Sequence, residues 1–310
     1  MIYEIITKLF LIIFLILVIY PLYFVLVASF SDPMYVNSGE LLLWPKGFML
    51  LGYKRVFTDE RILIGYGNTI LYTTLGTLIG LCGTMLAAYS LSRKDLPGRR
   101  IIMLLFIFTM YFSGGTIPFY LVVKGLNLVN SRLFMVISGC ISVYNIIIAR
   151  SFLEANISEE LFDAASIDGC GNARFFGQIV VPLSKAVIAV IALYLAVSYW
   201  NSYFNAMIFL TDVKKYPLQL YLRQILLSVS ESTSTDSNLD PEALIQMQQM
   251  GQVIKYGVIV VSTVPIICVY QSSTRNAPPF APAPPRAPSA NWHRRSSGVR
   301  IDPHCRACVQ

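Results

Sequence analysis

Charged residues are scarce in this chain, and their scarcity excludes an ordinary soluble fold. Of the 310 residues only 13% are Asp, Glu, Lys or Arg, whereas 55% are hydrophobic and the mean hydropathy is +0.60. Soluble globular domains carry about 25% charged residues. The hydrophobic residues form continuous runs of about 18 or more, which is the length that crosses the hydrocarbon core of a bilayer. The composition therefore predicts an all-α, polytopic membrane protein.

Other absences exclude particular kinds of site. The chain has no G-x-x-x-x-G-K-[ST] segment and no Gly-Lys pair, so it lacks the loop that binds nucleotide phosphates in ATPases. Three of its six cysteines, Cys82, Cys140 and Cys268, lie in apolar runs. This distribution does not indicate a framework of disulfide bonds. Most of the net charge of +7 comes from residues 271–310, which hold six Arg and one Asp, so a nucleic-acid partner is not expected.

Six apolar runs are predicted to span the membrane. They cover roughly residues 9–29, 68–91, 101–123, 132–151, 184–210 and 253–270. None of the six contains Asp or Glu, which counts against an ion-coupled secondary transporter, because such transporters use carboxylates within the membrane. We expect one membrane domain over residues 1–270 and a separate tail over 271–310.

The orientation follows from the positively charged turn between the second and third runs. Residues 93–100 contain four cations and one anion, and short loops rich in Lys and Arg stay in the cytoplasm. This places both termini and the segment 152–183 in the cytoplasm, with 31–67 and 211–252 outside. The first run is too long for a signal peptide.

A helix break is predicted in the third run, at the segment Ser113–Pro118. Gly114 and Gly115, followed by Pro118, weaken the helix, and a broken helix in a membrane is tolerated where it is buried in protein or lines a cavity. The break can be a packing kink or a moving, gate-lining element.

A short polar helix is predicted between the fourth and fifth runs. Ser158 is a suitable N-cap, Glu159 and Glu160 fall in the first turn, and Gly169 provides the stop. Its alanines, Ala164 and Ala165, allow close approach of a partner surface. Because its polar face is acidic, attachment to the negative inner leaflet fits poorly, and docking of another protein fits better.

The spacing in this loop resembles a known family. Asp163-Ala164-Ala165, three residues, Gly169, nine residues, Ile179, one residue and Val181-Pro182 resemble the cytoplasmic EAA loop of ABC-importer permeases, with Asp for Glu and Val for Leu. Further stretches typical of the family are Tyr20–Tyr23, Ala28–Pro33, Trp44–Phe48, Ala88–Arg93 and Trp200–Asn205. Over residues 1–270 the chain is similar to carbohydrate-uptake permeases of the maltose-importer type, especially oligosaccharide permeases of Gram-positive bacteria.

The resemblance implies an ABC type-I importer permease fold with six transmembrane helices in the bacterial cell membrane. It implies a second permease subunit, a cytoplasmic ATPase dimer that holds ATP and Mg, and an extracellular solute-binding lipoprotein. No catalytic residue, cofactor or metal is expected in this chain. The residues expected to couple the loop to the ATPase are Glu160, Asp163, Ala164, Ala165, Asp168, Gly169, Ile179 and Pro182. A non-transporting scaffold subunit, the other alternative, would not need this spacing.

A sugar path is the hypothesis for the fifth run, where aromatic rings and amides suit a carbohydrate. The candidates are Trp200, Asn201, Tyr203 and Asn205. Hydrogen bonding between helices and anchoring at the membrane interface explain the same residues equally well. The partner subunit of a maltose-type importer can also hold most of the sugar contacts.

The tail departs from the family pattern. Residues 271–310 contain seven prolines and six arginines without apolar periodicity. Cys305 and Cys308 with His304 and His293 could form a zinc site, but a disordered tail is the simpler interpretation. A shifted reading frame after residue 270 is a further hypothesis.

Overall fold

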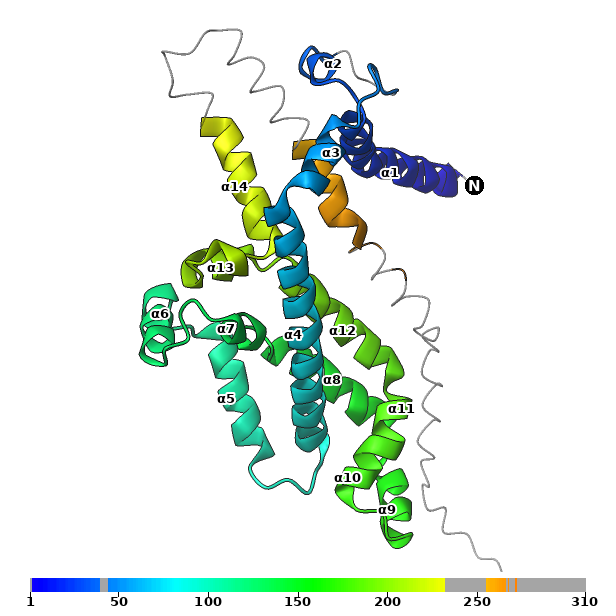
Figure 1. Cartoon of the computed structure of the whole chain (residues 1–310). Helices are drawn as coiled ribbons and strands as arrows, with labels where there is room; N and C mark the ends of the chain where they lie inside the picture. Colours follow the sequence, from blue (N-terminus) through cyan, green and yellow to red (C-terminus); the bar gives the residue numbers. More distant parts are fainter. Residues whose placement is uncertain (1, 40–43, 232–254, 266, 268–270, 272–310) are drawn as a thin grey trace, which may run out of the picture. The chain divides into compact units, whose positions relative to one another are not determined.

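The computed structural model describes residues 2–39, 44–231, 255–265, 267 and 271. Within these ranges the regular structure is entirely helical, with no strand (Figure 1). The tail residues considered for a zinc site, and all of the tail except residue 271, lie outside these ranges, so its predicted disorder and the reading-frame hypothesis stay untested. Residues 255–265 are helical. The other helices, in chain order, are α1 (Ile2–Ser29), α2 (Pro33–Asn37), α3 (Leu51–Thr58), α4 (Glu60–Ser92), α5 (Arg99–Tyr111), α6 (Thr116–Gly125), α7 (Arg132–Ile137), α8 (Val143–Asn156), α9 (Glu159–Ile167), α10 (Asn172–Phe175), a π-helix (Phe176–Val180), α11 (Val181–Leu183), α12 (Lys185–Trp200), α13 (Tyr203–Phe209), a 3₁₀ turn (Val213–Lys215) and α14 (Leu218–Glu231).

Helix α4 is the packing centre of the described residues. It has 33 residues, about 50 Å at the usual rise per residue, and it contacts α7, α8, α12 and α14 (Figure 1). Two of its glycines allow the closest approaches. A Cβ at Gly76 would collide with the ring of Tyr199, and one at Gly80 with the carbonyl group of Cys140. The small residues on α4 therefore let α12 and the α7–α8 connection lie directly against its backbone.

Two apolar clusters flank α4 at different positions along the chain. One joins the end of α4 to α8, α12 and the loop helices, through residues such as Ala88, Leu153 and Val187. The other gathers aromatic rings of α7 and α13, with Phe134 and Phe209 at 4.3 Å between ring centroids. The first cluster positions the 152–183 loop, and the second positions the broken helices described below.

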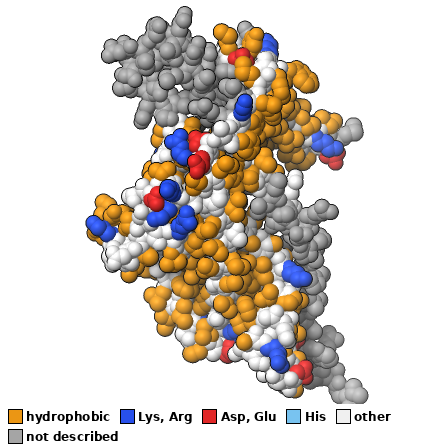
Figure 2. All heavy atoms as spheres, viewed as in Figure 1, with side chains coloured by type: hydrophobic (Ala, Val, Ile, Leu, Met, Phe, Trp, Pro, Cys, Tyr) orange, Lys and Arg blue, Asp and Glu red, His pale blue; other side chains and the backbone are white. Residues whose placement is uncertain are grey.

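Apolar side chains also cover the outside of the chain, as lipid or another membrane subunit requires. Helices α1 and α5 expose nearly all of theirs, for example Leu17, Leu104 and Phe108. Figure 2 shows hydrophobic side chains spread over much of the visible face. Such a surface would be unstable in water and suits a bilayer.

The prediction of six continuous spans is confirmed only in part. Helices α1 and α4 are each long and apolar enough to cross a membrane. The predicted span 101–123 is a pair, α5 and α6, bent by 112°, and the segments Asn172–Leu183 and Lys185–Trp200 form another pair bent by 82°. Counting each pair as one span gives at most four candidates among the described residues. The count of six is therefore not confirmed.

Two further predicted spans are interrupted by local backbone geometry. The run 132–151 breaks between α7 and α8, where Gly139 has a φ of +82°. The run 184–210 breaks between α12 and α13 at Asn201 and Ser202. Only part of the last run, 253–270, lies within the described residues. Hydrophobicity alone predicted continuous helices here because an apolar run looks the same whether or not the backbone turns within it.

Candidate functional site: the loop at residues 152–183 and the broken helices

Helix α9 begins and ends as its sequence predicts. The side chain of Ser158 accepts a hydrogen bond from the backbone N–H of Leu161 at 3.4 Å, and two glutamates occupy the first turn. At the other end Gly169 has a φ of +78°, a left-handed conformation that glycine adopts without strain. The N–H of Cys170 then bonds to the carbonyl of Ala165 at 2.9 Å. The predicted N-cap and stop are confirmed.

The two alanines of α9 face opposite environments. Ala165 is buried in the apolar cluster at the end of α4, whereas Ala164 is exposed. Phe162 is half-buried and meets the ring of Phe175 edge-on at 5.2 Å. The methyl group of Ala165 therefore packs inside the chain, and Ala164 is the alanine of the pair that lies on the surface.

The outward face of α9 mixes apolar and acidic side chains. Ile167 is 87% exposed and Leu161 37%, and Ala164 lies between them in sequence. The exposed acidic residues on this helix and its C-cap include Glu160, Asp163 and Asp168. An isoleucine so fully exposed on a structured helix stabilises nothing within the described chain.

The second half of the loop turns the chain into α12 through an irregular helix. Pro182 has no backbone N–H and cannot complete the α-helical hydrogen bond to the residue four positions earlier. The N–H of Val181 instead bonds to the carbonyl of Phe176, five residues back, as in a π-helix. Ile179 is half-buried against the apolar cluster and Pro182 is exposed. The 82° bend follows at Ser184.

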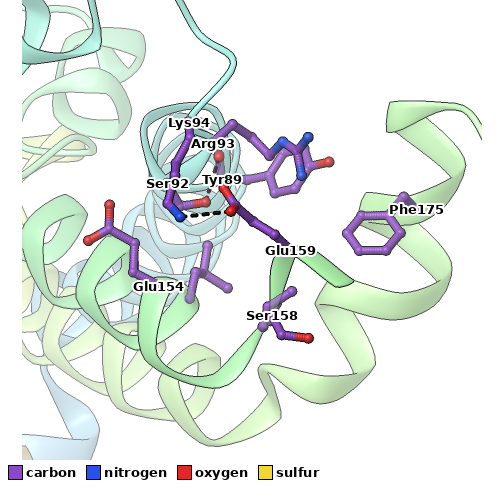
Figure 3. A pocket seen from close by; sticks show the side chains of 10 residues that line it. Tyr89, Ser92, Arg93, Lys94, Glu154, Ser158, Glu159 and Phe175 are labelled. Atoms are coloured by element: carbon purple, nitrogen blue, oxygen red, sulfur yellow. Dashed lines mark hydrogen bonds and ion pairs between the residues drawn. The ribbon is translucent and has the colours of Figure 1, made fainter. Parts of the chain in front are cut away.

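The turn between α4 and α5 packs against the start of α9 (Figure 3). Lys94 Nζ lies 2.7 Å from Glu159 Oε2, and Arg150 lies 2.9 Å from Glu154 within α8. A small cavity of about 40 Å³ lies between these elements, with Tyr89 and Phe175 among its lining residues. The end of α4 and its turn therefore meet the loop through the Lys94–Glu159 ion pair and the rings of Tyr89 and Phe175.

The arginine at the end of α4 also orders the turn itself. Arg93 Nε donates a hydrogen bond to Asp95 Oδ1 at 3.1 Å, and this bond lowers the pKa of the Asp95 carboxyl. Asp95 is therefore charged throughout the neutral pH range.

A second candidate site lies where three helix breaks come together. One pocket, of about 160 Å³, is lined by Ser138, Gly139, Ser198, Tyr199, Asn201, Ser202, Phe204 and Asn205. A neighbouring pocket, of about 320 Å³, is lined by Ser113, Gly114, Gly115, Thr116, Phe119, Phe204, Asn205, Ile208 and Phe209. The two pockets share Phe204 and Asn205, and Asn205 Nδ2 donates a hydrogen bond to Ser138 Oγ at 3.2 Å. Irregular backbone beside a polar cavity is where a membrane protein tolerates broken helices.

The structure separates the four residues predicted for a sugar path. Asn201 and Asn205 line these pockets. Trp200 is buried, and its indole N–H donates to the carbonyl of Ser262 at 3.2 Å. The guanidinium of Arg223 lies over the ring of Tyr203 at 4.6 Å. Trp200 and Tyr203 thus have partners within the chain and do not line either pocket.

The residues of the predicted helix break also differ in whether they line a pocket. Gly114 and Gly115 line the larger pocket, whereas Pro118 lies in the first turn of α6 and is absent from the lining. Sequence reasoning missed Tyr199, whose hydroxyl donates to the carbonyl of Val136 at 2.6 Å, and the hydroxyl groups of Ser138 and Ser202. The Ser138-Gly139 pair within an apolar run was the available signal.

Known proteins resemble the chain over most of its length, although no family model matches it. It is 39% identical over 268 residues to the polygalacturonan/rhamnogalacturonan transport system permease protein YtcP of Bacillus subtilis, covering 84% of this chain and 90% of that protein. It is 37% identical over 252 residues to the protein LplC of Bacillus subtilis, covering 81% and 83%.

A solved structure is also similar. One chain of a bacterial ABC transporter involved in the import of the acidic polysaccharide alginate matches with a TM-score of 0.78 and 32% identity, over 88% of this chain and 96% of that chain. The structural similarity and the sequence similarity thus cover nearly the same share of this chain. The chain therefore belongs to the carbohydrate ABC-transporter permeases.

Proposed function

We propose that this chain is a membrane-spanning subunit of a binding-protein-dependent importer, and that it helps to carry an oligosaccharide across the cytoplasmic membrane of a bacterium. A second permease subunit would complete the path, and an extracellular solute-binding lipoprotein would deliver the sugar. ATP and Mg would bind to a separate ATPase dimer, because this sequence has no nucleotide-binding loop. The relatives named as polysaccharide transporters support the substrate class.

The observation that carries the coupling role is the outward face of α9. It presents the exposed Ile167 beside exposed acidic side chains, on a helix whose other face is anchored by Ala165. An apolar anchor with an acidic rim fits a groove that has an apolar floor and basic edges. The ATPase subunit is the partner that supplies such a groove in this proposal, with Gly169, Ile179 and Pro182 shaping the loop rather than touching the partner.

Replacing Ile167 with Asp tests this docking. A buried apolar anchor typically contributes more than 1 kcal/mol to an interface, so I167D should reduce co-purification of the ATPase about fivefold or more. Membrane levels of the chain should stay unchanged, because Ile167 is 87% exposed and supports no internal packing.

A matched control is Met34→Asp on α2. Met34 is also an exposed apolar residue, at 64%, but it lies in the segment proposed to face outside. M34D should leave ATPase binding intact. Equal ATPase recovery with I167D and the unaltered chain would overturn the docking role.

For the sugar, we propose that the two pockets around Asn205 form this chain's part of the path. Their lining combines amide and hydroxyl groups with the flat faces of Phe119, Phe204 and Phe209. Carbohydrates bind through this combination of hydrogen bonds and apolar ring faces. Gly114 and Gly115 would then form part of the wall, with the α5–α6 break as the element that can move.

A further inference from the structure

Arg93 joins the end of α4 to α9 through a stack of planar side chains. Its guanidinium carbon lies 3.3 Å from the centroid of the Phe162 ring, at van der Waals contact. Phe162 in turn meets Phe175 of α10 edge-on, with 5.2 Å between ring centroids and 88° between planes. Phe175 is only 1% exposed. The stack therefore runs from the α4–α5 turn through α9 into the buried cluster.

The guanidinium is held in place by more than this ring. Arg93 Nε and Nη2 donate to the two carboxylate oxygens of Asp95, at 3.1 and 3.2 Å, and the Arg93 side chain is only 19% exposed. A pair of parallel bonds to one carboxylate fixes the plane of the guanidinium. A lysine at this position would keep the charge but could not present a flat face.

The other contact between the turn and α9 is weaker. Lys94 and Glu159 approach to 2.7 Å, but their side chains are 68% and 54% exposed. Ion pairs so open to solvent contribute little, since water and salt screen them. The arginine–phenylalanine contact is partly shielded, and cations above aromatic faces bind more strongly as they lose water.

Along the chain α9 follows α8 after two residues, but its covalent route to α12 is less direct than the stack. From α9 it passes through α10, the π-helix Phe176–Val180 and the 82° bend before it reaches α12. Helix α4, by contrast, extends without a break from Glu60 to Ser92 and contacts α8, α12 and α14. A displacement passed to its end would be conveyed to all three.

We propose that Arg93 is a positioning residue that makes the end of α4 move together with α9 when the ATPase displaces that helix. This inference rests on the proposed function, since it assumes that α9 is the docking helix. Arg93 acts through Phe162 and does not itself contact the ATPase or the sugar.

The test uses the complete importer in proteoliposomes and measures sugar transported per ATP hydrolysed. R93K and F162L should each lower this ratio, by roughly fivefold to 30-fold for a partly shielded cation–aromatic contact. The double variant should be no worse than either single variant, because both remove the same contact. F162Y keeps the ring and should retain the ratio.

The control is E159Q, which breaks only the exposed pair with Lys94 and should change the ratio less than about twofold. An unchanged ratio in R93K, or additive losses in the double variant, would overturn the positioning role. The two proposals fail separately. If I167D keeps the ATPase bound, the docking role of α9 is wrong. If I167D releases the ATPase while R93K transports normally, only the role of Arg93 is wrong.

Discussion

At the scale of single residues, the two neighbouring alanines on α9 lie in different environments. Ala165 lies in the apolar cluster with Ala88 and Leu153, and Ala164 lies on the surface one position earlier. Successive residues on a helix are 100° apart, so a two-alanine motif necessarily points in two directions. Packing within the chain thus explains the alanine at position 165, and the surface that α9 offers to a partner explains the alanine at position 164.

This division predicts opposite outcomes for the same substitution. Ala165→Leu should overpack the cluster and lower the free energy of unfolding by about 1–3 kcal/mol. Ala164→Leu should leave stability unchanged within about 0.5 kcal/mol and should reduce ATPase binding instead. Thermal unfolding of the purified chain in detergent, paired with ATPase co-purification, separates the two effects. Equal melting temperatures for both variants would contradict the division.

At the scale of elements, the breaks between helices are the features that build the second site. The α5–α6, α7–α8 and α12–α13 breaks contribute Gly115, Gly139 and Asn201 to pockets that no continuous helix could form. Sequence reasoning found the break at Gly114-Gly115, because paired glycines and a proline weaken a helix. It did not find the others, since Asn201-Ser202 and a single glycine within an apolar run give only weak local signals.

The α5–α6 break depends on one glycine. Gly115 has a φ of +85° and a ψ of 171°, a region that other residues hardly occupy. Gly115→Ala should therefore cost about 1–3 kcal/mol or rearrange the break. Gly114→Ala is the matched control, because a Cβ there meets only Pro118 Cβ at 4.0 Å and the φ is not positive. Hydrogen exchange of α5 and α6 would measure the change. Identical behaviour of the two variants would refute the role of Gly115.

At the scale of the whole chain, the composition was sufficient to predict the structural class, and the spacing of the loop motif was sufficient to predict the family. A mean hydropathy of +0.60 predicted a helical membrane protein, and the Asp163–Pro182 spacing predicted the importer permease that the relatives confirm. Tertiary partners could not be predicted. Nothing local to Trp200 indicates that its indole N–H meets the carbonyl of Ser262, 62 residues away, and such pairings decide which polar side chains remain for a ligand.

The orientation of the chain stays a prediction, and the exposed residues on α2 and α9 allow a direct test. Positive charges in the 93–100 turn predict that α9 lies in the cytoplasm and α2 outside. In a background without the six native cysteines, M34C should react with a membrane-impermeant maleimide in intact cells, because Met34 is 64% exposed. I167C, at a position that is 87% exposed in the chain alone, should react only after the membrane is opened, in cells that lack the ATPase subunits proposed to cover it. Both variants must reach the membrane at the level of the unaltered chain for the comparison to hold. Labelling of I167C in intact cells would invert the topology and would remove α9 from the reach of any cytoplasmic ATPase.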